Sequence, residues 1–311
     1  MAVPDRFPRE ISDLVVSFDQ ATLARRPVRR EDVLAKLEAH GMWRAIEIVS
    51  TWPHADGVLS PAYVDGVLLR SHLEMQRLSE EFQQGARMER LLLPLVDAAA
   101  SSGIVRPRIV DVGCGLGYVT RWLAARSRLA TQAELFGCDY HAALIAEATR
   151  LAERERLRCR FAVANAFALE EPASIFTSTG VIHHFRGESL HHFFTEQMQS
   201  GLLGFVHSDI KPSWLAPVGS WLFHKARMQE PLARIDGVLS AVRAHPGPAL
   251  VAAARASAAG YALFLFDAEP ELLPLLKVMQ ALIGVREDLA DEYVERLGPL
   301  RSRVRRVTAI Q

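Results

Sequence analysis

The sequence predicts an α/β protein built on a mainly parallel sheet, and three observations support this prediction. From residue 104 onward, short apolar runs alternate with helical stretches, which is typical of βαβ units on a parallel sheet. The first of these runs leads directly into a cluster of glycines at residues 113–117. The region before residue 104 shows apolar residues at helical spacing, which predicts a helical appendage to the sheet.

Length and composition limit the possible classes of protein. A chain of 311 residues predicts two domains, or one large domain with an appendage. Because 50% of the residues are hydrophobic, a sizeable core is expected and a disordered chain is excluded. The 36 basic residues balance the 36 acidic residues, which argues against a protein that wraps nucleic acid.

Cysteine content and hydropathy predict the compartment. The chain has too few cysteines for a disulfide framework, namely Cys114, Cys138 and Cys159, and this favours a reducing interior. Residues 1–10 lack a charged segment followed by an apolar one, and no apolar run approaches the roughly 18 residues that span a bilayer. We therefore expect a cytoplasmic protein that does not enter the membrane.

The elements are predicted in chain order. Helical spacing covers residues 31–49 and 71–100, with turn-forming residues at 53–61, and Gly85 and Pro94 predict a kink or break in the second stretch. Residues 1–104 are thus expected to form a helical N-terminal region. Seven short apolar runs are predicted as strands: 109–112, 135–138, 160–163, 174–178, 202–208, 261–266 and 303–310. In the second domain, residues 105–311, the long connections near 212–236 and 268–299 are predicted as helical insertions.

The glycine cluster in IVDVGCGLGY, residues 109–118, is the first segment that indicates chemistry. Glycines allow a sharp turn and let a ligand lie against bare backbone. The helix that follows offers unpaired N–H groups to an anion. The spacing is G-x-G-x-G, preceded by Asp111, whereas a dinucleotide site has G-x-G-x-x-G. A nicotinamide-dependent oxidoreductase would need its third glycine at Tyr118, where it is missing.

A second acidic residue, Asp139, closes the second apolar run. A carboxylate at the end of the second strand accepts hydrogen bonds from both hydroxyls of a ribose in several kinds of adenosine site. Asp139 therefore indicates an adenosine-containing ligand, and the glycine spacing with Asp111 decides which kind.

Four segments occur in order: VDVGCGLG, GCDYHAALIAEA, FAVANAFAL and TSTGVIHHF. Their series resembles that of class I S-adenosylmethionine-dependent methyltransferases. The resemblance covers residues 105–210 by motif and reaches the C-terminus by strand order. It implies S-adenosyl-L-methionine as the cofactor. It also implies a Rossmann-like, doubly wound sheet of seven strands with the last strand antiparallel.

The resemblance implies which residues bind the cofactor. Asp111 and the glycine loop would hold the amino-acid end, Asp139 the ribose, and Tyr140 would pack on the adenine. The family usually has an acidic residue for the adenine amino group where this chain has Asn165, but the asparagine carbonyl accepts the same hydrogen bond. The other implied contacts are Gly113, Cys114, Gly115, Gly117, Ala166, Thr179 and Gly180.

A helix before the first strand often closes over the cofactor in this family. Gln84 and Arg87 are the candidates in this chain to reach the cofactor carboxylate, because a guanidinium matches a carboxylate bidentately. The alternative is that both residues lie on the solvated face of an amphipathic helix.

The catalytic candidates are His183 and His184, on the stretch that the resemblance places beside the sulfonium. An imidazole there would take the proton from an attacking hydroxyl; the alternative is that one histidine only packs beneath the loop. His191 and His192 follow, but adjacent helical side chains point about 100° apart and no cysteine or carboxylate cluster completes a ligand set. We therefore predict no metal site.

Three further residues are candidates for binding the acceptor. His207 and Asp209 end the fifth predicted strand, and such strand ends face the ligand crevice of open α/β sheets. Trp214 begins an aromatic series that would wall an apolar pocket. The alternative is that these aromatic residues form the core of the insertion.

The sequence thus predicts methyl transfer to a small, hydrophobic organic acceptor, with oxygen preferred over nitrogen or carbon. Natural-product biosynthesis and a homodimer are further hypotheses. The chain lacks the N/D-P-P-Y/F and Pro-Cys motifs that the family uses on nucleic-acid bases. The rival hypothesis is a non-catalytic cofactor-binding or partner-activated subunit that kept the methyltransferase fold.

Overall fold

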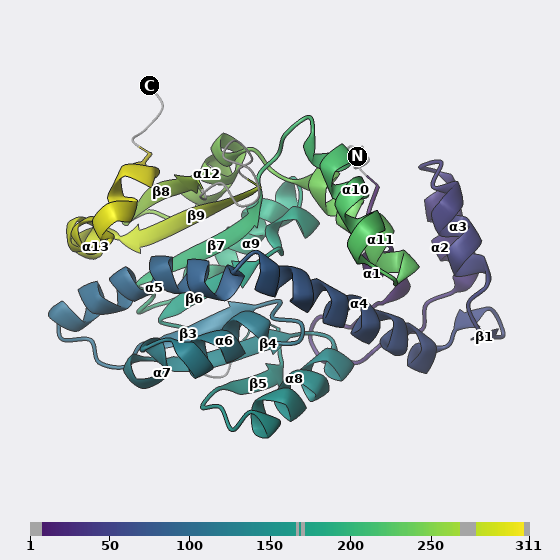
Figure 1. The fold of residues 1–311 in the computed structure, drawn as a ribbon, viewed down its shortest axis with the longest axis horizontal. Helices are drawn as coiled ribbons and strands as arrows, with labels where there is room; N and C mark the ends of the chain where they lie inside the picture. Colours follow the sequence, from purple (N-terminus) through teal and green to yellow (C-terminus); the bar gives the residue numbers. More distant parts are fainter. Residues whose placement is uncertain (1–7, 166–167, 169–171, 268–277, 308–311) are drawn as a thin grey trace. The chain divides into compact units, whose positions relative to one another are not determined.

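The computed structural model describes residues 8–165, 168, 172–267 and 278–307. These residues form two compact units, each of which combines two stretches of the chain (Figure 1). Residues 1–78 and 212–243 belong to the first unit, and residues 79–211 and 244–311 to the second. Among the described residues, no helix is long and apolar enough to span a bilayer.

The second unit contains a sheet of eight strands in the order β10-β8-β9-β7-β6-β3-β4-β5. Five neighbouring strands pair with one another in parallel: β3 (Arg108–Val112), β4 (Glu134–Asp139), β5 (Arg160–Val163), β6 (Ile175–Thr179) and β7 (Gly204–Ile210). The antiparallel β9 (Met279–Arg286) lies between β7 and β8 (Tyr261–Asp267), and β10 (Val304–Arg306) pairs antiparallel with β8. The doubly wound, Rossmann-like class predicted from the sequence is confirmed.

The strand count and one insertion differ from the prediction. Residues 279–286, predicted as part of a helical insertion at 268–299, form β9. Seven of its eight residues are buried, so the strand lacks the polar–apolar alternation that identifies a half-buried strand. Residues 268–277 of that insertion lie outside the described residues, and helix begins again only after β9, at residue 287.

Helices cover the two faces of the sheet and create two cores. One core includes α5 (Gln84–Ser101), α6 (Tyr118–Arg126) and α13 (Ala290–Arg296), and the other α9 (Glu188–Gln197) and α12 (Gly247–Arg255). Successive residues of β3 alternate between them, with Ile109 in the first core and Val110 in the second, as the period of a strand requires. The remaining helices are α7 (Leu129–Gln132), α8 (Ala142–Arg154) and the short 3₁₀ turns η1 (Ile182–His184), η2 (Glu287–Leu289) and η3 (Gly298–Arg303).

The helix predicted at 71–100 is interrupted, but at neither residue that was expected to break it. The chain separates α4 (Pro61–Glu81) from α5 at Gln83, whose φ is 51°. Pro94 lies inside α5. Gly85 is required by packing, because a Cβ there would lie 2.3 Å from Cγ of Trp122 on α6.

The first unit is helical except for one hairpin. It contains α1 (Ile11–Val15), α2 (Arg30–Glu38), α3 (Trp43–Ser50), most of α4, α10 (Ala216–Arg227) and α11 (Pro231–Arg243), around a core of its own. The hairpin joins β1 (His54–Ala55) to β2 (Val58–Leu59) through Asp56 and Gly57, both with positive φ, as a tight Asp-Gly turn needs. The helix predicted at 31–49 is two helices, and residues 212–236 are largely helical as predicted.

The compact units do not coincide with the domains predicted from the sequence. Helix α5, which belongs to residues 1–104, packs in the core of the second unit. The division at residue 104 therefore stays a prediction about roles, with residues 1–104 as a lid and 105–311 as the cofactor-binding domain.

Candidate functional site

The candidate site lies at the carboxyl edge of the parallel strands. The order of strands reverses between β3 and β6: β4 and β5 follow β3 on one side, and β6 and β7 lie on the other. Ligands of open α/β sheets bind in the crevice at such a switch point. Val112 pairs with Cys138 and Thr179 with Ser208, so the residues that follow all four strands are brought to the same edge.

The glycine loop between β3 and α6 is shaped as predicted. Gly113, Gly115 and Gly117 all have positive φ, at 64°, 54° and 67°, a backbone region that side chains disfavour. A Cβ on Gly117 would lie 2.3 Å from Cε1 of Phe161, and one on Gly113 would lie 2.9 Å from Cγ2 of Val181. The absence of a Cβ at these two positions therefore lets the side chains of Phe161 and Val181 pack closely against the loop backbone.

Asp139 is tied to this loop. Its Oδ2 accepts a hydrogen bond from the Gly115 N–H at 3.1 Å, and its Oδ1 accepts one from the His141 N–H at 2.9 Å. Each carboxylate oxygen has a second lone pair, so the pair of oxygens keeps the capacity to accept from two hydroxyls. Tyr140, next to it, is 45% exposed, and its ring offers a surface for a planar base.

Asp111 is buried one residue before the end of β3. Burial raises the pKa of its carboxyl to about 7, the hydrogen bond from Thr120 Oγ1 at 2.9 Å lowers it in part, and Asp139 raises it further. A nearby cation favours the ionised form of such a group. Asp111 is therefore suited to a ligand that carries an ammonium or sulfonium charge.

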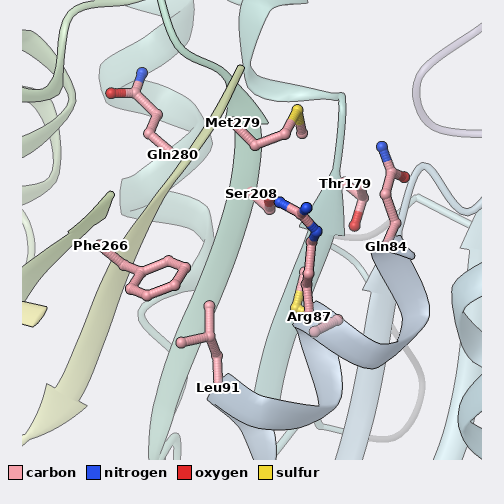
Figure 2. Close-up of a pocket in the computed structure, with 9 residues that line it drawn as sticks. Gln84, Arg87, Leu91, Thr179, Ser208, Phe266, Met279 and Gln280 are labelled. Atoms are coloured by element: carbon pink, nitrogen blue, oxygen red, sulfur yellow. The ribbon is translucent and has the colours of Figure 1, made fainter. Parts of the chain in front are cut away.

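A small hollow lies where α5 begins (Figure 2). Gln84 and Arg87 contribute to its lining from α5 and Thr179 from β6, so three predicted cofactor residues come together. The hollow has about 10 Å³, room for about one water molecule. Thr179 Oγ1 is buried and has no hydrogen-bond partner among the described residues. A buried hydroxyl without a partner is costly, and a polar ligand group would satisfy it.

His183 and Asp209 form a buried pair. The Asp209 carboxylate accepts from His183 Nδ1 at 2.8 Å through Oδ1, and from the His183 backbone N–H at 2.9 Å through Oδ2. Burial alone would raise the pKa of Asp209, but the charge and hydrogen bond of His183 and two backbone N–H groups lower it overall. Because Nδ1 donates to Asp209, the ring would accept a further proton at Nε2. The His184 ring lies against that of His183, with centroids 4.4 Å apart.

His207 has a different environment from the one we expected. It is fully buried against Phe193 and Phe205, its Nε2 donates to Gln197 Oε1 at 2.7 Å, and its Nδ1 accepts from Ser178 Oγ at 2.8 Å. Burial lowers its pKa to about 3, so the ring is neutral. Both ring nitrogens are engaged, and we leave His207 out of the proposed acceptor site.

The remaining predicted residues are dispersed. Trp214 belongs to the first unit and is 86% exposed, so it lies neither in a core nor in the hollow. Gly180 follows β6, where its N–H donates to Ser208 O. Asn165 is half-buried after β5, and Ala166 lies outside the described residues. The hollow is also lined by Ser208, Met279 and Gln280; the sequence analysis missed the last two because it missed β9.

Comparisons with known proteins show similarity in one sequence segment and in the fold. Residues 109–200 match the family model of a methyltransferase domain. The plantazolicin methyltransferase BamL, solved with a triazolic desmethylPZN analog and SAH, aligns with a TM-score of 0.50 and 11% identity over 72% of this chain and 96% of BamL. Magnesium protoporphyrin IX methyltransferase (ChlM) from Synechocystis PCC 6803 with bound SAH aligns with a TM-score of 0.45 and 14% identity over 83% and 99% of the two chains. At such identities the structural likeness is one of fold. No curated protein matches the chain.

Proposed function

We propose that this chain, of which residues 109–200 match the family model of a methyltransferase domain, transfers the methyl group of S-adenosylmethionine to a hydroxyl oxygen on a small, hydrophobic organic acceptor. The observation that carries this proposal is the His183–Asp209 pair. His183 follows β6 and Asp209 lies near the end of β7, so the pair is at the same carboxyl edge of the sheet as the glycine loop. A histidine held in this way is a general base for a hydroxyl.

The residues at the strand ends have the chemical groups that this cofactor requires. We assign the amino-acid end to Asp111 and the glycine loop, the ribose to Asp139 and the adenine to Tyr140 and Asn165. Gln84, Arg87 and the buried hydroxyl of Thr179 are assigned to its carboxylate end. When bound, S-adenosylmethionine supplies an activated methyl group and leaves as a neutral thioether.

The residues of this chain then have two tasks. His183 takes the acceptor proton at Nε2, while Asp209 stabilises the resulting imidazolium and fixes the ring through two contacts. The backbone loop and the start of α5 orient the two reactants, and alignment in a site that excludes water supplies much of the rate. In this proposal residues 1–104 act as the lid over the cofactor through α5.

Isothermal titration calorimetry tests the cofactor site. We expect S-adenosylmethionine and S-adenosylhomocysteine to bind with micromolar Kd and NAD not to bind. Asp139→Ala should weaken S-adenosylhomocysteine roughly 30-fold or more, since two hydrogen bonds to a charged acceptor are lost. Glu134→Ala is the matched control, because Glu134 is exposed at the opposite end of the same strand. Equal affinity of the two variants would remove Asp139 from the site.

Transfer of a labelled methyl group tests the reaction. A panel of hydrophobic phenols, aliphatic alcohols and matched amines should give product with a hydroxyl compound, and His183→Ala should lose most of that activity. Cofactor binding without transfer to any member of the panel would favour the non-catalytic or partner-activated subunit. Product from amines alone would overturn the O-methylation proposal.

A further inference from the structure

The first unit contains a groove that the proposed methyl transfer does not use. It measures about 530 Å³ and lies among α3, α10 and α11. Ile48 comes from α3, Trp221 from α10, and Ile235, Val238 and Leu239 from α11. Most of the lining is apolar, and the volume is in the range of about 300–1,000 Å³ found for small-molecule sites.

Among the charged side chains that line the groove, positive charges outnumber negative ones. Arg44, Lys225 and Arg234 contribute three positive charges and Glu47 one negative charge. Among the described residues none of the three cations forms an ion pair within 4.0 Å. Arg234 is held in place by a hydrogen bond from its Nε to Met228 O at 2.7 Å. The groove therefore has an excess of positive charge beside an apolar lining.

The aromatic wall of the groove is exposed to a ligand. Trp221 is 48% exposed, and Lys225 Nζ lies 4.8 Å from the centre of a Trp221 ring. Helix α10 buries none of its residues in the described structure, so the side chains that it contributes to the groove stay accessible. A half-exposed tryptophan with a lysine ammonium over one ring face places an apolar aromatic surface beside a positive charge, which suits a flat or acyl group joined to an anion.

We propose that this groove binds a small organic anion in which an aryl or acyl body carries one carboxylate or phosphate group. The body would lie against Trp221, Ile235 and Val238, and the anionic group would lie near Lys225 and Arg44. This site is additional to the methyl-transfer site and does not depend on it.

The test uses 8-anilinonaphthalene-1-sulfonate as an anionic aromatic probe and N-phenyl-1-naphthylamine as its neutral counterpart. Trp221→Ala should raise the Kd of the anionic probe about tenfold through lost apolar contact. Trp214→Ala is the matched control, because Trp214 is 86% exposed and lies outside the groove. The Kd of the anionic probe for this variant should stay within about twofold of the value for the natural protein. Similar effects of the two variants would overturn the site.

The charge requirement is tested separately. The double variant Arg44→Met/Lys225→Met should weaken the anionic probe roughly tenfold and leave the neutral probe within about twofold. Arg227→Met on the same helix serves as the control. Dodecanoate, below its micelle concentration, should displace the anionic probe better than 1-dodecanol does. Equal loss for both probes, or equal displacement, would overturn the proposed anion.

A vesicle assay separates a small ligand from a lipid surface. Vesicles of phosphatidylcholine with phosphatidylglycerol should not retain the protein in sedimentation, since the proposed ligand is a small organic anion and not a lipid surface. Retention that is lost in Trp221→Ala would overturn the proposal in favour of an anionic membrane surface.

Discussion

At the scale of single residues, Asp209 fixes both the side chain and the backbone of His183. One oxygen holds the His183 ring and the other holds the His183 backbone, so the turn η1 and the imidazole are fixed by the same carboxylate. Its lowered pKa keeps it ionised at neutral pH. A negative charge therefore lies beside the ring at the moment when the ring would take up a proton.

Asp209→Asn tests this arrangement through the pH dependence of methyl transfer. The change removes the charge that stabilises the imidazolium, so the pKa of the base falls and the acid limb of the kcat profile moves to lower pH. We expect kcat at its plateau to fall roughly 10- to 100-fold, because the ring is also less well oriented. Asp291→Asn, at a carboxylate that is 98% exposed on α13, is the control and should leave the limb in place. An unmoved limb in Asp209→Asn would contradict the role of the carboxylate.

Tyr293 on α13 is a residue at which removal of a buried polar group should stabilise the protein. Its hydroxyl is buried and has no partner among the described residues, and burial raises its pKa so that it stays neutral. Because an unpaired buried hydroxyl is costly, Tyr293→Phe should raise the free energy of unfolding by about 1 kcal/mol. Tyr261→Phe should lower it by about 1 kcal/mol, since that hydroxyl donates to Leu202 O at 2.8 Å. Urea unfolding of both variants checks the pair, and loss of stability in Tyr293→Phe would show that its hydroxyl has a partner.

At the scale of elements, the loop between β3 and α6 depends on two separate properties of its glycines. Gly117 combines a positive φ with contact against Phe161, whereas Gly180, after β6, has a similar φ but nothing within 4 Å of its absent Cβ. The two positions therefore separate backbone strain from steric exclusion.

Gly180→Ala should lower the free energy of unfolding by about 1 kcal/mol, from strain alone. Gly117→Ala should lower it by roughly 3 kcal/mol, because Phe161 must also move, and should weaken S-adenosylhomocysteine. Thermal or urea unfolding gives the two values. Adding Phe161→Leu should recover part of the loss only for Gly117→Ala; recovery for both, or for neither, would contradict the steric explanation.

The elements also show what the sequence can predict. The loop was predictable because glycine spacing and an apolar run are local signals, and the structure confirms the strand–loop–helix order. Strand β9 was not predictable, because it is buried on both faces and its sequence therefore lacks the alternation of apolar and polar residues that marks a half-buried strand. Gly85 looks like a helix breaker, but its role depends on Trp122, which is close only in the folded chain.

In the candidate site, too, local sequence signals were predictive, whereas contacts between distant residues were not. Asp111, Asp139 and Thr179 reach the predicted edge because each is at or near a strand end, which the sequence marks. His207 and Asp209 look equivalent in sequence, yet Asp209 holds His183 and His207 is enclosed by phenylalanines. Their separate roles depend on residues from other elements, which no local pattern reveals.

At the scale of the whole molecule, the first unit has a core separate from the two cores of the second unit. It also contains a buried carboxylate that ties its two chain segments together. Asp236 on α11 accepts hydrogen bonds from the backbone N–H of Ile11 at 2.7 Å and of Ser12 at 3.0 Å. Burial raises its pKa to about 7, and Glu10 raises it further, although the backbone hydrogen bonds lower it in part. The stability of this unit is therefore expected to depend on pH.

The sign follows from the raised pKa. Between pH 4 and 7 the folded protein binds this proton more readily than the unfolded chain does, so the stability it contributes is lost as the pH rises through about 7. In differential scanning calorimetry, the Tm of the natural protein should fall more steeply from pH 5 to 8 than that of Asp236→Asn. Asp291→Asn, at a carboxylate that is 98% exposed, is the control and should keep the natural slope. Parallel curves for Asp236→Asn and the natural protein would contradict the assignment.

The contact between Ile11 and Asp236 also has a consequence for synthesis, because these residues are 225 positions apart. The N-terminal helices leave the ribosome long before α10 and α11 exist, while the strands of the other unit emerge in between. At roughly 5–20 residues per second, that delay is on the order of 10–45 seconds. During this interval the apolar faces of α1 to α4 lack the helix that completes their core. A nascent chain arrested after residue 211 should accordingly be bound by chaperones at its N-terminal segment, and one released after residue 243 should not.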